Sequence, residues 1–277
     1  MLNAAVLKTL KYWIEERDNI RALKEGGAPK PWTKDVILQS YRFCNVRRED
    51  DAVTRQIAAG WRNPKYWGKH NFVPAMIFAR TINWPATLEY IGFPDSWSSE
   101  EILTKLDQYQ GMGHKTYTGA YFITAGPTGV RKNAWVVGNA NSYFFSPPRL
   151  DPLSLENSWR EILENKYPCV GPFIAGQVIA DLKYTSHLRE AKDWWNWAAI
   201  GPGSMRGLNR LFERNLKTKI TQEQGLEELR EVASHLQQYK SQYLHLQDVQ
   251  NCLCELDKYE RVVWGEGKPK SGYKGQA

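Results

Sequence analysis

The sequence predicts an all-α, mainly helical protein. Apolar residues recur at helical spacing along most of the 277 residues, and several of these segments begin with a capping residue or end at glycine. The sequence lacks the alternation of strands with helices that is typical of a parallel sheet. Hydrophobic residues make up 42% of the chain and charged residues 24%, a mixture that favours a folded protein over a disordered one.

Six helices are predicted in the first part of the chain. Gly26 ends the first of them, and Thr33 is expected to cap the second. Pro85 divides the fourth from the fifth, and Ser99 with the glutamates after it opens the sixth. The predicted ranges are 2–25, 33–42, 50–59, 71–83, 85–92 and 99–110.

The middle of the chain has a different composition. Gly, Thr, Tyr and Val concentrate between residues 111 and 143, around a turn at 126–129. The apolar runs 118–125 and 134–140 flank this turn and predict either one short β-hairpin or a loop beside a site. Five more helices are predicted after Pro147, at 154–165, 172–182, 204–215, 222–239 and 246–259.

We expect a single helical domain over residues 1–264, with two lobes at about 1–145 and 146–264 as the alternative. Residues 265–277 are rich in Gly and Lys and predict a basic tail that is flexible or folds onto nucleic acid. No apolar run approaches the roughly 20 residues that span a bilayer. The N-terminus reaches Lys8 too soon for a signal peptide, so we expect a cytoplasmic protein with no membrane partner.

The charge balance favours a polyanionic partner. The formal net charge is +7 and the pI about 9.1, and clustered basic side chains release counterions from a phosphate backbone. The chain also carries 12 Trp and 14 Tyr, whose flat faces can stack on unpaired bases. Filling the core is the usual role of such residues, and that alternative applies to each of them.

Sequence motifs of several enzyme classes are absent. There is no phosphate-binding loop of kinases, no dinucleotide fingerprint, no H-E-x-x-H and no zinc deaminase signature. Cys252 and Cys254 form the one close cysteine pair and lack the second pair of a structural zinc site, so we interpret all four cysteines as reduced thiols. The sequence therefore indicates no cofactor, and it leaves a divalent metal requirement and the oligomeric state open.

A tight turn at Val170 and Gly171 leads into an apolar helix whose first amides would face a DNA phosphate. This segment resembles the hairpin of the helix–hairpin–helix DNA glycosylase superfamily. In lyase-type members a catalytic lysine follows the hairpin, and Phe173 holds that place here. The catalytic aspartate of the superfamily falls near Gly201, with Asp193 a little upstream. The resemblance implies a glycosylase-like scaffold whose original chemistry has been replaced.

Three further motifs carry a second resemblance: Trp32-Thr-Lys-Asp with YRFCNVRREDDAVTR at 41–55, IGPGSMRGLNR at 200–210, and LCELDKYER at 253–261. In this order they resemble the α-glutamyl/putrescinyl-thymine pyrophosphorylase family, also described as amino acid:DNA transferases. The helical domain of 5-hydroxymethyluracil DNA kinases is similar to that family. The resemblance runs from about Trp13 to Tyr273 and is to members encoded by bacteriophages with hypermodified thymine.

That resemblance implies a reaction on DNA containing modified thymine, in the host cell cytoplasm if the chain is phage-encoded. An amine from an amino acid or polyamine displaces pyrophosphate from 5-(pyrophosphoryloxymethyl)uracil and becomes bonded to the 5-methylene carbon. The sequence does not identify the donor, for which glycine is one candidate. Two other interpretations stay open: an N-glycosylase for a modified pyrimidine, and a non-catalytic DNA-binding module.

The residues in these motifs suit such chemistry, because a pyrophosphate leaving group needs concentrated positive charge and the amine must lose a proton to a carboxylate. The arginines expected to bind pyrophosphate are Arg42, Arg47, Arg48, Arg55 and Arg206. The candidate catalytic carboxylates are Glu49, Asp51, Glu255 and Asp257. Alternatively, the RREDD run is a solvated helix start with ordinary ion pairs, and Arg206 pairs with a surface acid.

Further residues are expected to contact DNA. The turn before Ser204 resembles a second anion-binding turn at a helix start. The expected DNA contacts are Val170, Gly171, Phe173, Gly203, Ser204 and Lys258. The target base is expected to flip into an aromatic-lined cleft. The candidates for stacking on it are Trp32, Tyr117 and Tyr121, each with core packing as the alternative.

Overall fold

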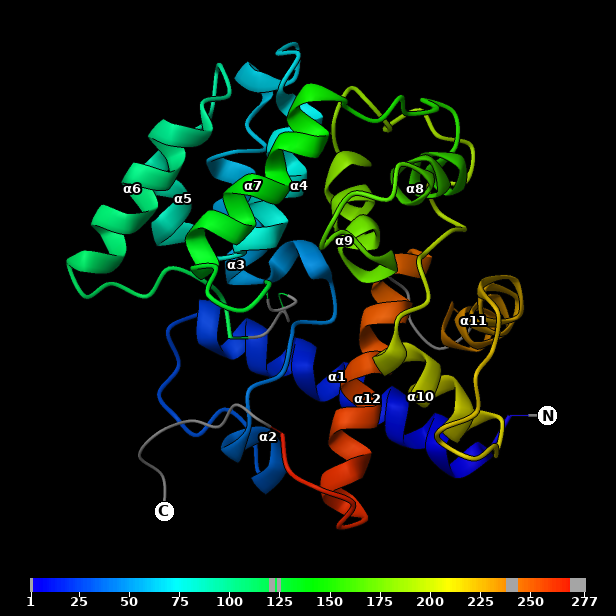
Figure 1. Ribbon diagram of the computed structural model, residues 1–277. Coiled ribbons are helices and arrows are strands. Elements are labelled where there is room, and N and C mark those ends of the chain that lie inside the picture. The colour runs from blue at the N-terminus through cyan, green and yellow to red at the C-terminus, as the bar shows by residue number, and fades with distance from the viewer. Residues whose placement is uncertain (1, 120–122, 124–125, 238–243, 270–277) are drawn as a thin grey trace. The chain divides into compact units, whose positions relative to one another are not determined.

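The computed structural model describes residues 2–119, 123, 126–237 and 244–269 (Figure 1). These residues form helices and loops without a β-strand, so the predicted all-α class is confirmed. No helix among them is long and apolar enough to cross a membrane. The chain divides into two compact units: unit 1 is Met1–Asp51 with Trp195–Ala277, and unit 2 is Ala52–Trp194. These units have other bounds than the suggested lobes at about 1–145 and 146–264, and the predicted domain organisation stays a prediction.

Unit 1 is built around its C-terminal helix. Its elements are α1 (Ala4–Glu25), α2 (Val36–Ser40), the 3₁₀ turn η1 (Arg48–Asp50), α10 (Pro202–Leu211), α11 (Gln222–Gln237) and α12 (Leu246–Val263). Helix α12 packs against α1, α10, α11 and η1. Its fully buried residues Val249, Cys252, Leu253 and Leu256 follow the i, i+3, i+4, i+7 spacing of one helix face, so α12 contributes a continuous stripe to the core.

Two glycines set the close approach of α10 to α12. A Cβ atom at Gly203 would lie 2.3 Å from the Sγ of Cys254, and one at Gly207 would lie 2.4 Å from the carbonyl oxygen of Leu253. At Gly207 the neighbour is backbone, which cannot rotate away, so this helix pair requires the absence of a side chain there. At Gly203 an added side chain would require the thiol of Cys254 to move.

Unit 2 is built around α4. Its elements are α3 (Ala52–Ala59), the 3₁₀ turn η2 (Pro64–Tyr66), α4 (Phe72–Ile82), α5 (Pro85–Ile91), α6 (Ser99–Gly111), α7 (Lys132–Phe145), α8 (Leu155–Glu164) and α9 (Pro172–Leu182). Every residue of α4 is buried, and the helix packs against α5, α7 and α9. A helix that is covered on all sides can be apolar all round, as FVPAMIFARTI nearly is.

All eleven helices predicted from the sequence are present, with ends shifted by a few residues. Helix α10 begins and ends earlier than predicted, and α12 ends later than predicted. The predicted cap of α2 was wrong. Asp35 caps this helix, because its Oδ1 accepts hydrogen bonds from the amides of Ile37 at 2.8 Å and Leu38 at 3.0 Å. Thr33 lies further upstream and accepts a hydrogen bond from the amide of Asp35 at 3.0 Å.

The suggested β-hairpin was also wrong in its second arm. Residues 134–140 belong to α7, whose buried side chains Asn133, Val136, Val137 and Ala140 have helical rather than alternating spacing. Two adjacent valines satisfy both periods in a short run, which is why the pattern was ambiguous. Of the other arm, residues 120–122 and 124–125 lie outside the described residues.

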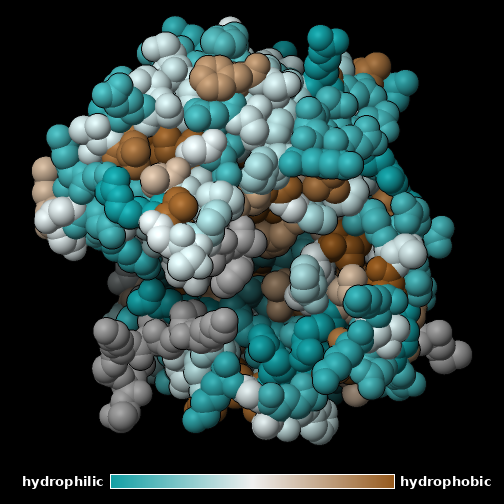
Figure 2. Space-filling view, viewed as in Figure 1, coloured by the Kyte–Doolittle hydropathy of each residue, from teal (hydrophilic) through white to brown (hydrophobic). Residues whose placement is uncertain are grey.

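On the face seen in Figure 2, hydrophilic side chains predominate and apolar ones show in separate places.

Candidate functional site

The loop between α2 and η1 carries the predicted site residues Arg42 and Arg47, and η1 carries Arg48 and Glu49. Arg17, a buried residue of α1, binds this loop: its Nε donates to the carbonyl oxygen of Cys44 at 3.1 Å. Its Nη2 donates to the carbonyl oxygen of Phe43 at 3.3 Å and to Oδ1 of Asn45 at 3.1 Å. One buried guanidinium therefore fixes three successive residues of the loop, a rigid arrangement because charge-assisted hydrogen bonds are strong.

Helix α12 holds the same loop with three polar side chains at positions i, i+3 and i+7, which lie on one helix face. Oδ1 of Asp248 accepts a hydrogen bond from the amide of Arg48 at 3.0 Å. Nδ2 of Asn251 donates to the carbonyl oxygen of Asn45 at 3.1 Å. Oε2 of Glu255 accepts a hydrogen bond from the amide of Cys44 at 3.0 Å. These side chains satisfy backbone groups of a loop that has no regular structure of its own.

Asp51, the residue that follows η1, has an altered acidity. Its Oδ1 accepts a hydrogen bond from the amide of Asn45 at 2.7 Å. Burial raises the pKa of Asp51 from 3.8 to about 6, even though the hydrogen bond from Asn45 and the charge of Arg48 act in the opposite direction. A carboxyl group with a pKa near 6 can accept a proton close to neutral pH and release it again.

The second candidate carboxylate, Glu255, is engaged in structural contacts. Besides the amide of Cys44, it binds Nζ of Lys258 at 2.5 Å. The same ammonium donates to the carbonyl oxygen of Arg42 at 3.0 Å and lies 4.7 Å from the ring centroid of Phe43. Lys258, a predicted DNA contact, thus also fastens α12 to the loop.

Asp257 is surrounded by arginines. Nε of Arg206 and Nε of Arg210 each lie 2.9 Å from its oxygens, and Nε of Arg261 lies at 3.3 Å. The side chain of Asp257 is 3% exposed. A buried carboxylate of this kind compensates the charges of its guanidinium partners and is engaged in ion pairs. Arg206 thus pairs with an acid, as the alternative held, but this acid is buried and not at the surface.

The predicted arginines differ in accessibility. In unit 1, Arg42 is exposed, Arg47 is half-buried, and Arg48 is 5% exposed with its Nη1 3.5 Å from Oε1 of Glu49. Arg55 lies on α3 of unit 2 and is exposed. Arg42 and Arg47 are therefore the loop arginines whose side chains solvent reaches.

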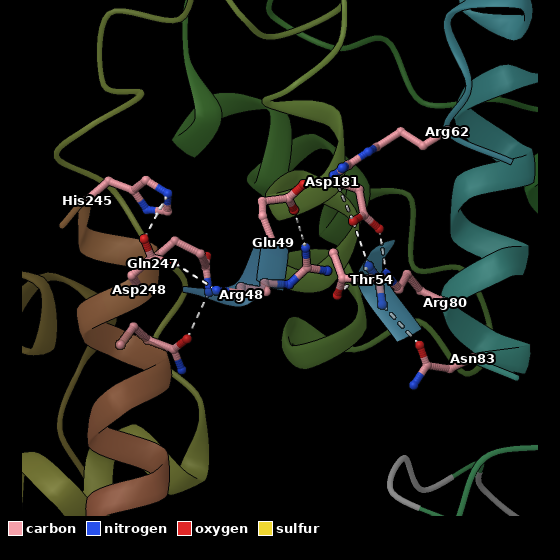
Figure 3. Close-up of polar contacts among 11 residues, drawn as sticks. Arg48, Glu49, Thr54, Arg62, Arg80, Asn83, Asp181, His245, Gln247 and Asp248 are labelled. Carbon is pink, nitrogen blue, oxygen red and sulfur yellow. Dashed lines mark hydrogen bonds and ion pairs between the residues drawn. The ribbon is translucent and has the colours of Figure 1, made fainter. Parts of the chain in front are cut away.

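Sequence reasoning missed a histidine beside Arg48. Nε2 of His245, the residue before α12, lies 3.1 Å from Oδ2 of Asp248, whose other oxygen accepts the amide of Arg48 (Figure 3). Both His245 and Asp248 are buried. The sequence does not indicate that His245 and Asp248 form a pair, because a single histidine is no motif. Their i, i+3 spacing at the start of a helix only permits the contact.

Unit 2 contains a buried ionic network that sequence reasoning also missed. Arg80 binds Asp181 with two hydrogen bonds of 2.5 and 2.6 Å, and Nη1 of Arg62 lies 3.4 Å from the same carboxylate (Figure 3). Arg80 also donates to Oδ1 of Asn83 at 3.0 Å and to Oγ1 of Thr54 at 3.4 Å. Asp181 is fully buried, so its two guanidinium partners are needed to compensate its charge.

The predicted hairpin is the connection between α8 and α9. Val170 is buried, whereas Gly171 and Phe173 are exposed. Gly171 is the N-cap residue of α9, where no side chain caps the helix, and a Cβ atom added to it would meet no heavy atom within 4 Å. The backbone at Gly171 is therefore accessible on its Cα side, as a contact with phosphate requires.

The second predicted DNA-binding turn is largely internal. Ser204 is fully buried, and its hydroxyl donates to the carbonyl oxygen of Gly201 at 3.0 Å and accepts from Nε2 of Gln250 at 3.1 Å. Gly203 faces Cys254 of α12. A DNA contact through the Ser204 side chain is excluded in this structure by its burial, and both residues instead join α10 to α12.

The candidates for stacking on a base are placed differently. Tyr117 is 8% exposed, donates its hydroxyl to Oδ1 of Asn133 at 2.7 Å, and has Nζ of Lys132 4.3 Å from its ring centroid, so its ring is not available to a base. Trp32 is half-buried and lines a cavity of about 40 Å³, with room for only a few water molecules. Tyr121 lies outside the described residues.

Among the described residues, no group of three or more His, Cys, Asp or Glu side chains is arranged to hold a metal ion. The four cysteines are free thiols. Burial raises the pKa of Cys254 to about 12, which keeps this thiol protonated.

Most of the chain matches a known protein family. Residues 4–269 match the family model described as 5-hmdU DNA kinase, helical domain. The 5-hmdU DNA kinase of Bacillus phage SP10 is 27% identical over 230 residues, which cover 72% of this chain but 35% of that protein, about a third of its length. No solved structure matches. The similarity to the helical domain of these kinases is confirmed, whereas the narrower resemblance to the pyrophosphorylase family and to the glycosylase scaffold stays a prediction.

Proposed function

This chain belongs to the family of the 5-hmdU DNA kinase helical domain, and on that premise we propose that it modifies thymine-derived bases in phage DNA. The proposed reaction transfers an amine onto 5-(pyrophosphoryloxymethyl)uracil and releases pyrophosphate. The residues that would perform it lie in the loop between α2 and η1, in η1 itself and at Asp51, which follows η1.

The observation that carries this proposal is the acidity of Asp51. Its pKa of about 6 lies near the pH of a cell, as a general base requires. The loop arginines Arg42 and Arg47 lie nine and four residues before it in sequence. Asp51 is a better candidate than Asp257, which three arginines surround, or Glu255, which binds Lys258.

The proposed step balances in atoms and electrons. The amine nitrogen attacks the 5-methylene carbon of the base with its lone pair, and the bond from that carbon to the pyrophosphate oxygen breaks. The pyrophosphate leaves with the bonding electrons and is stabilised by arginine guanidiniums. Asp51 accepts the proton that the nitrogen loses, which prevents the new bond from reverting.

A second candidate function is a non-catalytic module that binds modified DNA. The matched region is about a third of the SP10 kinase, so in that protein the helical domain accompanies further chain. This chain would then supply DNA recognition to a separate catalytic protein.

One assay separates these functions. The protein is incubated with DNA that contains 5-(pyrophosphoryloxymethyl)uracil and a mixture of amino acids and polyamines, and the nucleosides are identified by mass spectrometry. Transfer predicts a new nucleoside whose mass equals thymidine plus the amine minus two hydrogens, with one pyrophosphate released per nucleoside. Free base with an abasic site would indicate a glycosylase, and binding without any new product would indicate the module.

A further inference from the structure

A groove in unit 2 lies apart from the residues discussed so far. It runs between α3 and α5 and has a volume of about 650 Å³, within the range of small-molecule sites. Trp61 gives it a rigid wall, because this side chain is 4% exposed, stacks on Phe78 and donates its indole N–H to the carbonyl oxygen of Leu88 at 3.0 Å. The groove therefore has a preformed apolar surface.

The charge of the lining selects the kind of ligand. Most lining residues are apolar, Gln56 is neutral, and Glu89 is the one ionisable side chain among the described lining residues. Glu89 is exposed, so its carboxylate lies at the solvent side of the groove. A carboxylate beside an apolar surface attracts a cation with an aliphatic stem and repels an anion.

Trp84 supplies a second feature that favours a cation. It lines the groove at the start of α5, and Nζ of Lys115 lies 4.0 Å from the centroid of its ring. The negative face of an indole attracts ammonium groups, and here it already holds one. Lys115 is exposed and does not line the groove, so its side chain can move away.

We propose that the groove between α3 and α5 binds an aliphatic ammonium ion, with the ammonium over Trp84 or at Glu89 and the carbon chain along the apolar wall. The described lining residues include no cationic side chain to pair with an α-carboxylate, which favours an amine or diamine over an amino acid. The role of this ligand as the donor rests on the proposed function. The binding of this ligand to the groove does not rest on the proposed function, because it is measured without DNA.

The test uses three ligands of equal chain length: butane-1,4-diamine, butane-1,4-diol and succinate. Calorimetric titration of the full chain should show binding of the diamine, at least ten-fold weaker binding of the diol, and none of succinate. Equal affinity for the diamine and the diol would show that the groove binds apolar chains without recognising an ammonium group, and would overturn the proposal.

Two substitutions of exposed side chains should change the diamine affinity in opposite directions. Glu89→Gln should weaken it about two- to five-fold, the range of one exposed ionic contact. Lys115→Gln should strengthen it, because the resident ammonium no longer repels the ligand or competes for Trp84. Glu164→Gln, exposed at the end of α8, is the matched control and should leave it unchanged. Weaker binding in Lys115→Gln, or unchanged binding in Glu89→Gln, would contradict the proposal whether or not transfer to DNA is observed.

Discussion

Asp51 accepts a hydrogen bond of 2.7 Å from the backbone amide of Asn45, yet the pKa of its carboxyl group is raised to about 6. A single amide donor normally lowers the pKa of a carboxyl group, so the effect of burial dominates here. Burial therefore makes the Asp51 carboxylate a stronger base than that of an exposed aspartate. Near neutral pH the group is still mostly ionised and can accept a proton.

This relationship predicts how the stability depends on pH. Between pH 4 and pH 6 the folded protein keeps a proton on Asp51 that the unfolded chain has lost, so the free energy of unfolding falls as the pH rises through this window. Asp51→Asn removes that dependence and keeps an oxygen for the amide of Asn45. Its stability relative to the native protein should increase by about 2–3 kcal/mol between pH 4 and pH 7, measured by urea unfolding. A difference that does not vary with pH would contradict the raised pKa.

The contact of α10 with α12 predicts a strong effect of one methyl group. Gly207→Ala places a Cβ against the backbone of Leu253 and should lower the stability of unit 1 by about 2–3 kcal/mol, because backbone cannot rotate away. At Gly138, inside α7, an added Cβ atom would meet no heavy atom within 4 Å, so Gly138→Ala should instead stabilise by about 0.5–1 kcal/mol. Thermal unfolding that ranks the two variants in the reverse order would show that the helices separate easily.

The buried network of unit 2 predicts a large cost for removing one charge. Asp181→Asn leaves the guanidinium of Arg80 without its carboxylate and should destabilise the protein by about 3–5 kcal/mol. The exposed pair of Lys69 and Asp95, 3.3 Å apart in the same unit, is the control, and Asp95→Asn should change the stability by less than about 0.5 kcal/mol. Similar losses in both variants, measured by urea unfolding, would be incompatible with a buried ion pair at Asp181.

The hairpin before α9 predicts an electrostatic effect on DNA binding. Gly171 has open space around its Cα and an ordinary negative φ of −89°, so Gly171→Gln and Gly171→Glu should both fold normally. If the hairpin contacts phosphate, the glutamate should weaken binding about ten-fold more than glutamine at low salt, and this gap should narrow as salt increases. Equal affinities of the two variants would place the DNA elsewhere.

The helices were predictable because their signals are local. Apolar spacing, prolines and glycines define α4, α5 and α9 without knowledge of the fold. Helix α7 was missed because adjacent valines in a Gly-rich region also suit a strand. The cap of α2 was misplaced because Thr33 and Asp35 are both capping residues, and only the backbone geometry distinguishes them.

The site was predictable only as far as its residues are neighbours in sequence. The run from Arg47 to Asp51 is visible as a cluster of charges. Asp248 is 200 residues from its partner Arg48, and Glu255 is 211 residues from its partner Cys44. Arg80 and Asp181 are 101 residues apart. Packing alone brings such pairs together, and it also decides that Asp51 is the carboxylate with raised pKa while Asp257 is enclosed by arginines.

The most direct test of the proposed function is the pH dependence of kcat/KM for the amine, followed as pyrophosphate release from DNA containing 5-(pyrophosphoryloxymethyl)uracil. With Asp51 as the base, the logarithm of kcat/KM should rise with a slope of about two below pH 6, where both Asp51 and the amine lose protons, and of about one above it. Asp51→Asn should be about 10²-fold slower and keep a slope of one throughout, while the neighbouring Asp50→Asn should behave like the native protein. An Asp51→Asn variant with native turnover and the same change of slope would contradict the assignment.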